Sequence, residues 1–389
     1  MKLPARKEKE IKNLTLKLTL LILTIFLIGA TSGPAAAPMR ETGAAWKVEW
    51  DKTVEAAKKE GAVSVYSMWA PETRTALTQA FKQKYGINVE FTLFGSGAEI
   101  TARADKEKKA GLNAVDVFGA GASTLLTTMK PAGLLSSLEP ALVLPEVTEV
   151  KYWSDNKLPL MDKDKTTLAM LSIPYVHLVV NSDLVKKGTV KSYKDLLKPE
   201  YKGKITLNDP GLPGPGTSLL ALLGEVWNIE ETKDYLKQLI KKQDVAIQRD
   251  GRIHMESVAR GKYAIGLSPY ADLLVDMTKA GAPIESIFPR EGVYYGAASG
   301  CIAVPAKNVH PNAAKVFINW LLSKEGQAIF IRTYGYPSNR TDVPTDGIVL
   351  PALLPPPGIR KVMDSEEITE LVRKWRNMAK EIMASPGAN

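Results

Sequence analysis

The sequence predicts an α/β fold built as two lobes, each a mostly parallel sheet flanked by helices. Short apolar strand patterns alternate with amphipathic helix patterns along most of the chain, and β-loop-α units of this kind form parallel sheets. The chain has 389 residues, more than one hydrophobic core usually organises. A hydrophobic share of 45% and a charged share of 24% are those of an ordinary globular protein.

The first half of the chain begins with a predicted buried strand over Val63–Tyr66. An amphipathic helix is expected over Glu72–Tyr85, closed by Gly86, because apolar residues recur there at helical spacing. Alternating apolar residues over Ile87–Leu93 then indicate a half-buried strand. The next expected elements are a helix over Ala98–Ala110, a strand over Val115–Phe118 and a helix over Ser123–Lys130.

The second half repeats this alternation after an apolar stretch over Leu168–Val180, which predicts paired strands and a connection between lobes. We place the crossings between lobes near Ala141–Leu171 and Gly292–Gly296. The expected strands are Lys204–Leu207, Val245–Gln248 and Ala264–Leu267; the expected helices are Thr217–Trp227, Glu230–Lys242, Ile253–Arg260, Ala271–Ala280, Pro311–Tyr334 and Ile368–Met383. Lobe one is expected to comprise residues 44–170 and 295–345, and lobe two residues 171–294 and 346–389.

The N-terminal 37 residues have the pattern of a signal peptide. Basic residues precede the apolar run Leu18–Ile28, and small residues follow it. A transmembrane anchor is the alternative, but this run of about 11 residues is short of the roughly 20 that span a bilayer. We therefore expect export and a soluble periplasmic protein.

Charge and cysteine content restrict the partners. Removing the six basic and two acidic residues of the leader lowers the net charge from +9 to +5, and no long basic run remains. This argues against nucleic acid and is compatible with an anionic solute. Because Cys301 is the only cysteine, no internal disulfide, cysteine-built zinc site or lipoprotein anchor near the leader is possible.

Four stretches of the sequence carry a resemblance to a known family. They are Tyr85–Val89 leading to Gly95–Glu99, then Val115–Phe118, then Tyr193–Ile205, and finally Asn319–Gln327 with its letters NWLLSKEGQ. In this order they resemble family 1 extracellular solute-binding proteins, within them the branch around ferric-iron-binding proteins.

The resemblance implies a type II periplasmic-binding fold, with a ligand held between two lobes that close about a hinge. It also implies a solute-binding component of an ABC importer that delivers its ligand to permease and ATPase subunits in the membrane, with no cofactor and as a monomer. Two other functions stay open. An enzyme on this fold is disfavoured because no nucleophile elbow, HExxH or P-loop is present, and a sensor using the same clamp cannot be distinguished from an importer component.

The candidate ligand site lies where predicted strands run into helices, because ligands of open α/β sheets bind at the carboxyl ends of strands. Glycine and hydroxyl residues gather there, and free N–H groups at helix starts suit a carboxylate, phosphate ester or phosphonate. The candidates are Ser67, Met68, Trp69, Ser96, Gly97, Ala122 and Ser123 from lobe one, and Gly216, Thr217, Ser218, Arg252, Tyr270 and Tyr294 from lobe two and the hinge.

Each candidate also has a purely structural interpretation. Ser96, Ser123 and Thr217 are residues that commonly cap helices, and a cap can also contact a ligand. Met68 and Trp69 pack either against an apolar part of the ligand or in the core. Arginines such as Arg252 are usually solvated, but a guanidinium in the cleft would bind an anion by two hydrogen bonds.

Ferric iron is the ligand that the resemblance suggests first, but the residues disfavour it. The expected tyrosine pair falls on Ser268–Ala271, the expected histidine on or near Ala70, and the expected carboxylate on Gly119–Gly121, so of this set only Tyr270 remains. One phenolate cannot hold this hard, highly charged ion. Tyr294 and its neighbour Tyr295 lie in a predicted strand and point to opposite faces. Of the three histidines, His254 is expected nearest the cleft, and His310, before Pro311, is expected to be structural.

Overall fold

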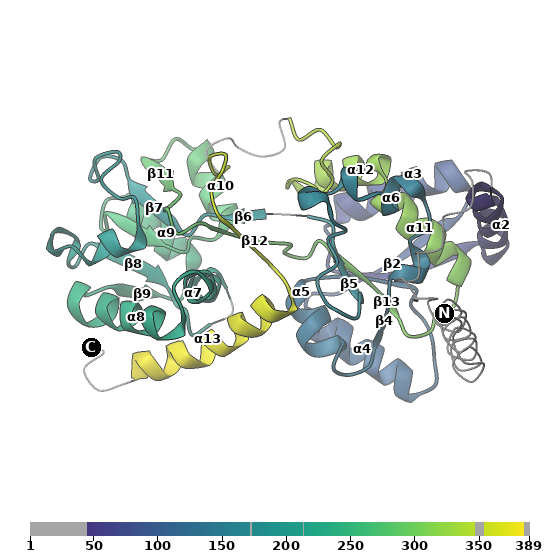
Figure 1. The fold of residues 1–389 in the computed structure, drawn as a ribbon, viewed down its shortest axis with the longest axis horizontal. Helices are drawn as coiled ribbons and strands as arrows, with labels where there is room; N and C mark the ends of the chain where they lie inside the picture. Colours follow the sequence, from purple (N-terminus) through teal and green to yellow (C-terminus); the bar gives the residue numbers. More distant parts are fainter. Residues whose placement is uncertain (1–44, 172, 213, 347–353, 385–389) are drawn as a thin grey trace, which may run out of the picture. The chain divides into compact units, whose positions relative to one another are not determined.

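The computed structural model describes residues 45–171, 173–212, 214–346 and 354–384. The predicted signal segment 1–37 lies outside these residues. One compact unit begins at Glu49, and it contains three sheets and the helices around them (Figure 1). None of the described helices combines the length and apolar character needed to cross a bilayer.

The first sheet has six strands. Its parallel part consists of β1 (Ala62–Ser67) between β2 (Asn88–Leu93) and β3 (Val117–Ala120). Antiparallel strands extend it: β13 (Cys301–Pro305) pairs with β3, β4 (Leu135–Ser136) and β5 (Thr167–Ala169). Strand β13 therefore returns to the first lobe from late in the chain, as a two-lobed fold requires.

The second sheet has the order β11-β7-β10-β8-β9. Strands β8 (Ile205–Asn208), β9 (Ala246–Gln248) and β10 (Ile265–Leu267) are parallel, and β7 (Leu178–Asn181) and β11 (Ile284–Ile287) are antiparallel additions. Both sheets are therefore mixed, with the predicted parallel strands joined by antiparallel partners.

A third, three-stranded sheet lies on the segments that run from one lobe to the other. Strand β6 (Ile173–Tyr175) pairs with β12 (Val293–Gly296), which also pairs with β14 (Lys361–Met363). The predicted crossing at Gly292–Gly296 agrees with β12. The expected crossing at Ala141–Leu171 was placed too early, because Leu144, Val147 and Leu168 are buried in the first core and β5 pairs within the first sheet.

Helices cover the two larger sheets. Those around the first sheet are α2 (Ala45–Glu60), α3 (Pro71–Tyr85), α4 (Gly97–Lys109), α5 (Ala122–Thr124) with a π-helix over Leu125–Met129, α6 (Pro145–Thr148), α11 (Pro311–Leu322) and α12 (Lys324–Tyr334). Those around the second are α7 (Pro215–Val226), α8 (Ile229–Gln243), α9 (Gly251–Ala259), α10 (Ala271–Lys279) and α13 (Glu366–Ala384). The expected continuous helix over Pro311–Tyr334 is thus two helices, because Ser323 caps a new one through the N–H of Gly326.

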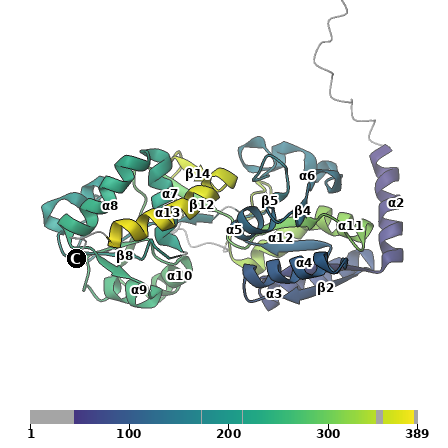
Figure 2. The ribbon, with the colours of Figure 1, turned by 90° about the horizontal axis from the view of Figure 1, so that it is seen from below.

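The last helix, α13, crosses from the second core to the first lobe. Its Trp375 packs on α7 at Gly224, where a Cβ atom would lie only 2.6 Å from the indole nitrogen. Its first turn lies beside α5 (Figures 1 and 2), and the N–H of Glu366 donates to the carbonyl of Met161 at 3.0 Å. The C-terminal segment therefore ties the two lobes together on one side.

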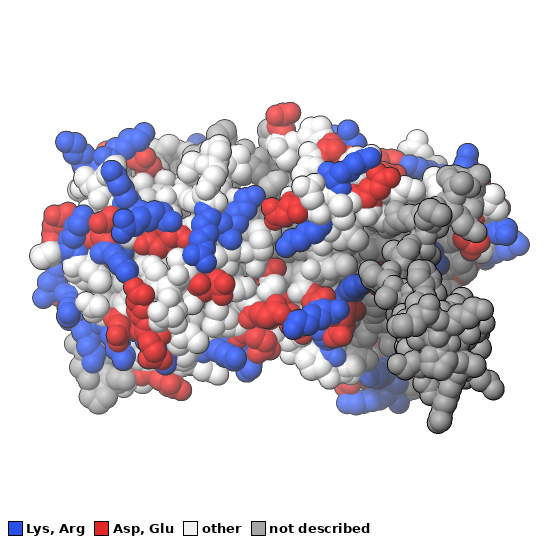
Figure 3. Space-filling model, in the orientation of Figure 1, with Lys and Arg blue, Asp and Glu red and all other residues white. Residues whose placement is uncertain are grey.

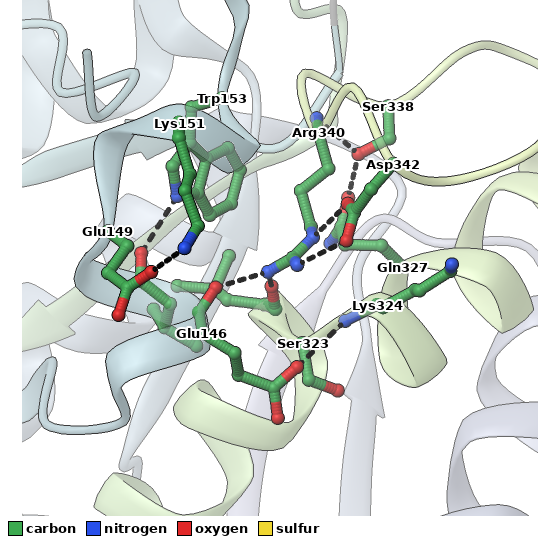
Figure 4. A network of polar contacts seen from close by, with 12 residues as sticks. Glu146, Glu149, Lys151, Trp153, Ser323, Lys324, Gln327, Ser338, Arg340 and Asp342 are labelled. Atoms are coloured by element: carbon green, nitrogen blue, oxygen red, sulfur yellow. Dashed lines mark hydrogen bonds and ion pairs between the residues drawn. The ribbon is translucent and has the colours of Figure 1, made fainter. Parts of the chain in front are cut away.

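Arg340 organises the segment after α12. Its side chain is 1% exposed, forms an ion pair with Asp342 at 2.9 Å, and donates to the carbonyls of Glu146 and Leu322 (Figure 4). The guanidinium also lies over the rings of Tyr152 and Trp153. The chain returning from α12 is thereby held against the segment over Leu144–Trp153.

His310 is structural, as expected. Buried Asp116 accepts hydrogen bonds from the N–H groups of Ser64, Val309 and His310, and lies 2.8 Å from His310 Nδ1. This carboxylate joins β1 to the turn before α11.

Candidate functional site

A cavity of about 440 Å³ lies beside the three-stranded sheet and has residues of both lobes in its wall. Five tyrosines line it: Tyr175, Tyr270, Tyr294, Tyr334 and Tyr336. The rest of the wall is mostly small or apolar, with Ser218 as a further hydroxyl group. Pockets that bind small molecules commonly combine apolar and aromatic walls with a few polar groups.

Two of these tyrosines come from neighbouring strands. Tyr175 of β6 and Tyr294 of β12 are directly paired, and their ring centroids lie 5.4 Å apart. Gly296 makes room for this arrangement, because a Cβ atom there would lie 2.7 Å from the Tyr175 hydroxyl. As predicted from strand geometry, Tyr295 points to the other face, where it lines a separate cavity.

Tyr270 precedes α10 and is held by two glycines. A Cβ atom at Gly251 would lie 2.5 Å from its ring, and one at Gly214 would lie 2.9 Å from its hydroxyl. Two residues before Tyr270, Ser268 has a positive φ of 60°, unusual for a residue other than glycine. This tight turn directs the Tyr270 side chain into the cavity wall.

Tyr334 and Tyr336 come from the first lobe. Helix α12 ends at Gly335 with a φ of 86°, where the Gly335 N–H donates to the carbonyl of Ile331. Tyr334 stacks on Phe330 at 5.1 Å between centroids, and its hydroxyl accepts from the N–H of Ser299 at 3.1 Å. The helix end and its glycine therefore fix two phenol groups on the lobe-one side.

Two helix N-termini also reach the cavity. Helix α7 begins at Pro215 after Gly214, and α10 begins at Ala271 after Tyr270; neither helix start has a side-chain cap. Gly214, Pro215, Tyr270 and Ala271 all lie in the wall. The first N–H groups of a helix lack intrahelical partners and favour negative charge, so both starts can receive an anionic group.

No charged side chain belongs to the described wall of this cavity. A hydrogen bond from wall residue Tyr294 leads to the carboxyl of Asp364, which also accepts from the hydroxyl of Thr369. Burial raises the pKa of Asp364 to about 6. Burial and the Asp364 charge also raise the pKa of Tyr175 and Tyr294, and burial raises that of Tyr334. These phenols are therefore neutral at physiological pH.

His177, rather than the expected His254, lies next to the cavity. Its ring is 2% exposed and contacts the rings of Tyr175 and Tyr294, with centroids 6.1 and 6.4 Å away. Neither ring nitrogen has a hydrogen-bond partner among the described residues, and burial lowers its pKa to about 3. His254 is fully buried behind the sheet, with Nδ1 3.5 Å from the Thr206 hydroxyl.

The lobe-one candidates lie outside the wall of this cavity. Trp69 is completely buried, donates to the carbonyl of Ser299 at 2.9 Å and packs on Phe330, so it is a core residue. Met68 packs against the core and Ser67 is buried.

The candidates at the starts of α4 and α5 also have structural roles or lie elsewhere. Ser96 caps α4 through the N–H of Glu99, and a Cβ atom at Gly97 would overlap Thr124. Ala122 is buried in the core of this lobe, and Ser123 is exposed.

Three candidates from lobe two and the hinge line the cavity: Ser218, Tyr270 and Tyr294. Thr217 is fully buried and donates to the carbonyl of Leu212, and Gly216 packs against the carbonyl of Asn208, so both shape the start of α7 instead. Arg252 is exposed on α9 and does not belong to the wall.

Sequence reasoning missed Tyr175, Tyr334 and Tyr336. The signal for the last two was an aromatic residue on each side of Gly335 at a helix end, and for Tyr175 an aromatic residue in a strand of the interlobe segment. The count of a single remaining phenol, on which the case against iron depended, was therefore incomplete. The described residues hold no group of three or more histidine, cysteine, aspartate or glutamate side chains able to bind a metal.

Comparison with known proteins defines the class. Residues 76–352 match the sequence profile of the bacterial extracellular solute-binding proteins. Because the match spans more than half of the chain, the chain belongs to this family. It is thus a solute-binding component of an ABC importer, a class that works with a ligand and a membrane permease.

Several characterised proteins resemble this chain at low identity. The spermidine/putrescine-binding periplasmic protein of Escherichia coli is 23% identical over 276 residues, covering 69% of this chain and 75% of that protein. Ferric iron-binding protein A of Mannheimia haemolytica, in an open conformation, has a TM-score of 0.67 at 18% identity, covering 83% and 98%. The binding protein AfuA of Actinobacillus pleuropneumoniae, with fructose-6-phosphate bound, has a TM-score of 0.57 at 23% identity, covering 82% and 99%. These structures share the two-lobed fold.

Proposed function

We propose that this protein captures a small organic anion, a carboxylate, phosphate ester or phosphonate, in the tyrosine-lined cavity and delivers it to its permease. The observation that carries this proposal is the cavity wall itself. Two helix starts without side-chain caps meet neutral phenol groups there, and no carboxylate lies in the described wall. Such a wall offers hydrogen-bond donors to an anion and apolar surface to its carbon skeleton.

A polyamine fits this wall poorly. Several ammonium groups need carboxylates or other acceptors to replace their hydration, and none of the described wall residues is acidic. The relative that binds spermidine and putrescine therefore supports the class and the fold more than the ligand.

Ferric iron is a second candidate, favoured by the five tyrosines of the wall. Phenolate oxygens are hard ligands that suit this ion. However, binding must displace protons from phenols whose pKa is raised, as at Tyr175 and Tyr294, and this lowers affinity near neutral pH. Titration with ferric citrate tests it directly, because iron bound to tyrosinate gives a visible charge-transfer band.

A thermal-shift screen of the purified protein tests the proposed function. The panel contains carboxylates, sugar phosphates, phosphonates, ferric citrate and spermidine. We expect stabilisation by at least one organic anion, since a ligand that binds only the folded state raises its stability. Stabilisation by ferric citrate alone, or by spermidine alone, would contradict the proposal.

We extend the proposal to location and partners. The signal-like leader and the family support export to the periplasm, where the protein acts as a monomer with permease and ATPase subunits. Acidic and basic side chains are intermixed on the face seen in Figure 3, so nothing on that face suggests nucleic-acid binding. A sensor role is tested by gene neighbours: a histidine kinase gene in place of permease and ATPase genes would favour it.

A further inference from the structure

The cavity combines five aromatic rings with a wall whose described residues carry no charged side chain. The rings come from four places in the chain: strand β6, strand β12, the start of α10 and the end of α12. A wall that only had to hold an apolar group could be built from aliphatic residues. Repeated use of tyrosine places electron-rich rings around one volume.

Ring faces of this kind attract cations. A cation within about 6 Å of a tyrosine ring centroid is stabilised by the ring quadrupole, most strongly when water is excluded. Because burial raises the pKa of Tyr175, Tyr294 and Tyr334, the rings stay neutral, and they attract a cation through their quadrupoles rather than as phenolate anions. An ammonium without N–H groups suits this wall best, because it needs no hydrogen-bond acceptors.

The same wall also offers a place for an anionic group. The starts of α7 and α10, helices of 12 and 9 residues, lack side-chain caps and lie at the cavity. No arginine or lysine of the described wall balances an anion there. An anion transferred from water into such a site without a counter-charge loses much of its solvation energy. The missing positive charge is best supplied by the ligand itself.

We infer that the solute is a small zwitterion that joins a quaternary ammonium group to a carboxylate, with the ammonium among the tyrosine rings and the carboxylate at the starts of α7 and α10. This inference rests on the proposed function and narrows its ligand class. It disfavours phosphate esters, whose two negative charges would go unbalanced by the described wall.

The test uses a pair of compounds that differ in one atom. Trimethylglycine and 3,3-dimethylbutanoate have the same shape, but the second replaces the charged nitrogen with carbon. Isothermal titration calorimetry of the purified protein should give at least about 10-fold tighter binding of trimethylglycine. Glycine, with its primary ammonium, and choline, without a carboxylate, should each bind at least about 10-fold more weakly than trimethylglycine.

Two variants of one wall residue provide a second, independent test. Tyr270→Phe keeps the ring face and should hold trimethylglycine within about 3-fold of the wild type, whereas Tyr270→Leu removes the face and should weaken it about 10-fold. Circular dichroism checks that both variants are folded. If both variants bind as tightly as the wild type, the ring does not contact the ligand and the inference is wrong.

The outcomes separate this inference from the proposed function. Equal binding of the two matched compounds keeps an organic carboxylate as ligand but overturns the zwitterion. Binding of a sugar phosphate, without binding of trimethylglycine, keeps the organic anion of the proposed function but likewise overturns the zwitterion. If no organic anion and no zwitterion binds, both the zwitterion inference and the proposed function are wrong.

Discussion

Lys130 Nζ lies 2.8 Å from Glu366 Oε1, and this ion pair joins the end of the π-helix to the first residue of α13. Lys130 also contacts Asp162 at 2.8 Å and Asp164 at 2.9 Å. Burial disfavours its charge, but hydrogen bonds to the three carboxylates outweigh burial and raise the pKa of Lys130. The ammonium is therefore a fixed charge at a junction between the lobes.

Replacing this lysine should destabilise the protein. In Lys130→Met the side chain of Asp162, which is completely buried, loses its cation but keeps hydrogen bonds from Thr166 and Thr167. We expect the free energy of unfolding to fall by about 2 kcal/mol, measured by urea denaturation. The control is Lys109→Met. The ion pair of Lys109 with Asp105 is exposed, so this variant should lose less than about 0.5 kcal/mol of unfolding free energy. Equal losses of unfolding free energy in the two variants would show that the ion pairs of Lys130 stabilise the protein no more than an exposed pair does.

Asp364 should give the stability a pH dependence with a defined sign. Its folded pKa is about 6 against an ordinary value of 3.8, so the folded state holds a proton that the unfolded state has lost between about pH 4 and pH 6. Stability from this group therefore falls as pH rises through that window and is constant above it. Asp364→Asn should reduce this fall by on the order of 2 kcal/mol.

The measurement compares urea denaturation of wild type and Asp364→Asn from about pH 4 to pH 7. Asp105→Asn, at a more exposed position, is the control and should leave the wild-type slope intact. Parallel curves for wild type and Asp364→Asn would mean that this carboxyl is solvated in the folded state.

The glycine beside Tyr270 should control ligand binding. In Gly251→Ala the new Cβ atom would lie 2.5 Å from the Tyr270 ring, so the ring must move within the cavity wall. We expect at least about 10-fold weaker binding of the ligand found in the screen, because a misplaced wall group loses its contacts. Calorimetry with that ligand measures the change.

The matched control for this variant is Gly95→Ala. Its Cβ atom would meet only the Glu99 side chain, at 3.4 Å, and Gly95 does not belong to the described cavity wall. Both variants should remain folded by circular dichroism. Unchanged affinity in Gly251→Ala would place the ligand away from Tyr270.

Arg340 should be a major contributor to stability. Its removal in Arg340→Met leaves Asp342 without its partner and the carbonyls of Glu146 and buried Leu322 without their donor (Figure 4). We expect a loss of about 3 kcal/mol in the free energy of unfolding. Arg373→Met removes an exposed pair with Glu370 and should have little effect. A loss below about 1 kcal/mol in Arg340→Met would show that water replaces these contacts.

Local patterns in the sequence identified most helices and strands. Helix α3 and strands β1 and β8 lie within a few residues of the predicted ranges, because their apolar spacing and flanking glycines are local signals. The break between α11 and α12 was missed because Ser323 reads as an ordinary helix residue unless its hydroxyl is known to bond the Gly326 N–H.

The candidate site was predicted less well. In the second lobe, the choice of loops at strand ends selected Ser218 and Tyr270, which line the cavity. In the first lobe the same rule selected Trp69, which packs inward because Gly119 on the neighbouring strand leaves space for its ring. A loop position does not reveal whether its side chain turns toward solvent, a ligand or the core.

The sequence by itself determined the class of protein, the two-lobed α/β fold and the alternation of strands and helices, since these depend on local periodicity and ordered motifs. Only the tertiary structure decided which residues line the cavity. Tyr175, Tyr294 and Tyr334 are far apart in the chain. Strand pairing and the end of α12 bring them into the wall of one cavity. Such proximity arises from long-range packing, which the spacing of residues along a chain does not encode.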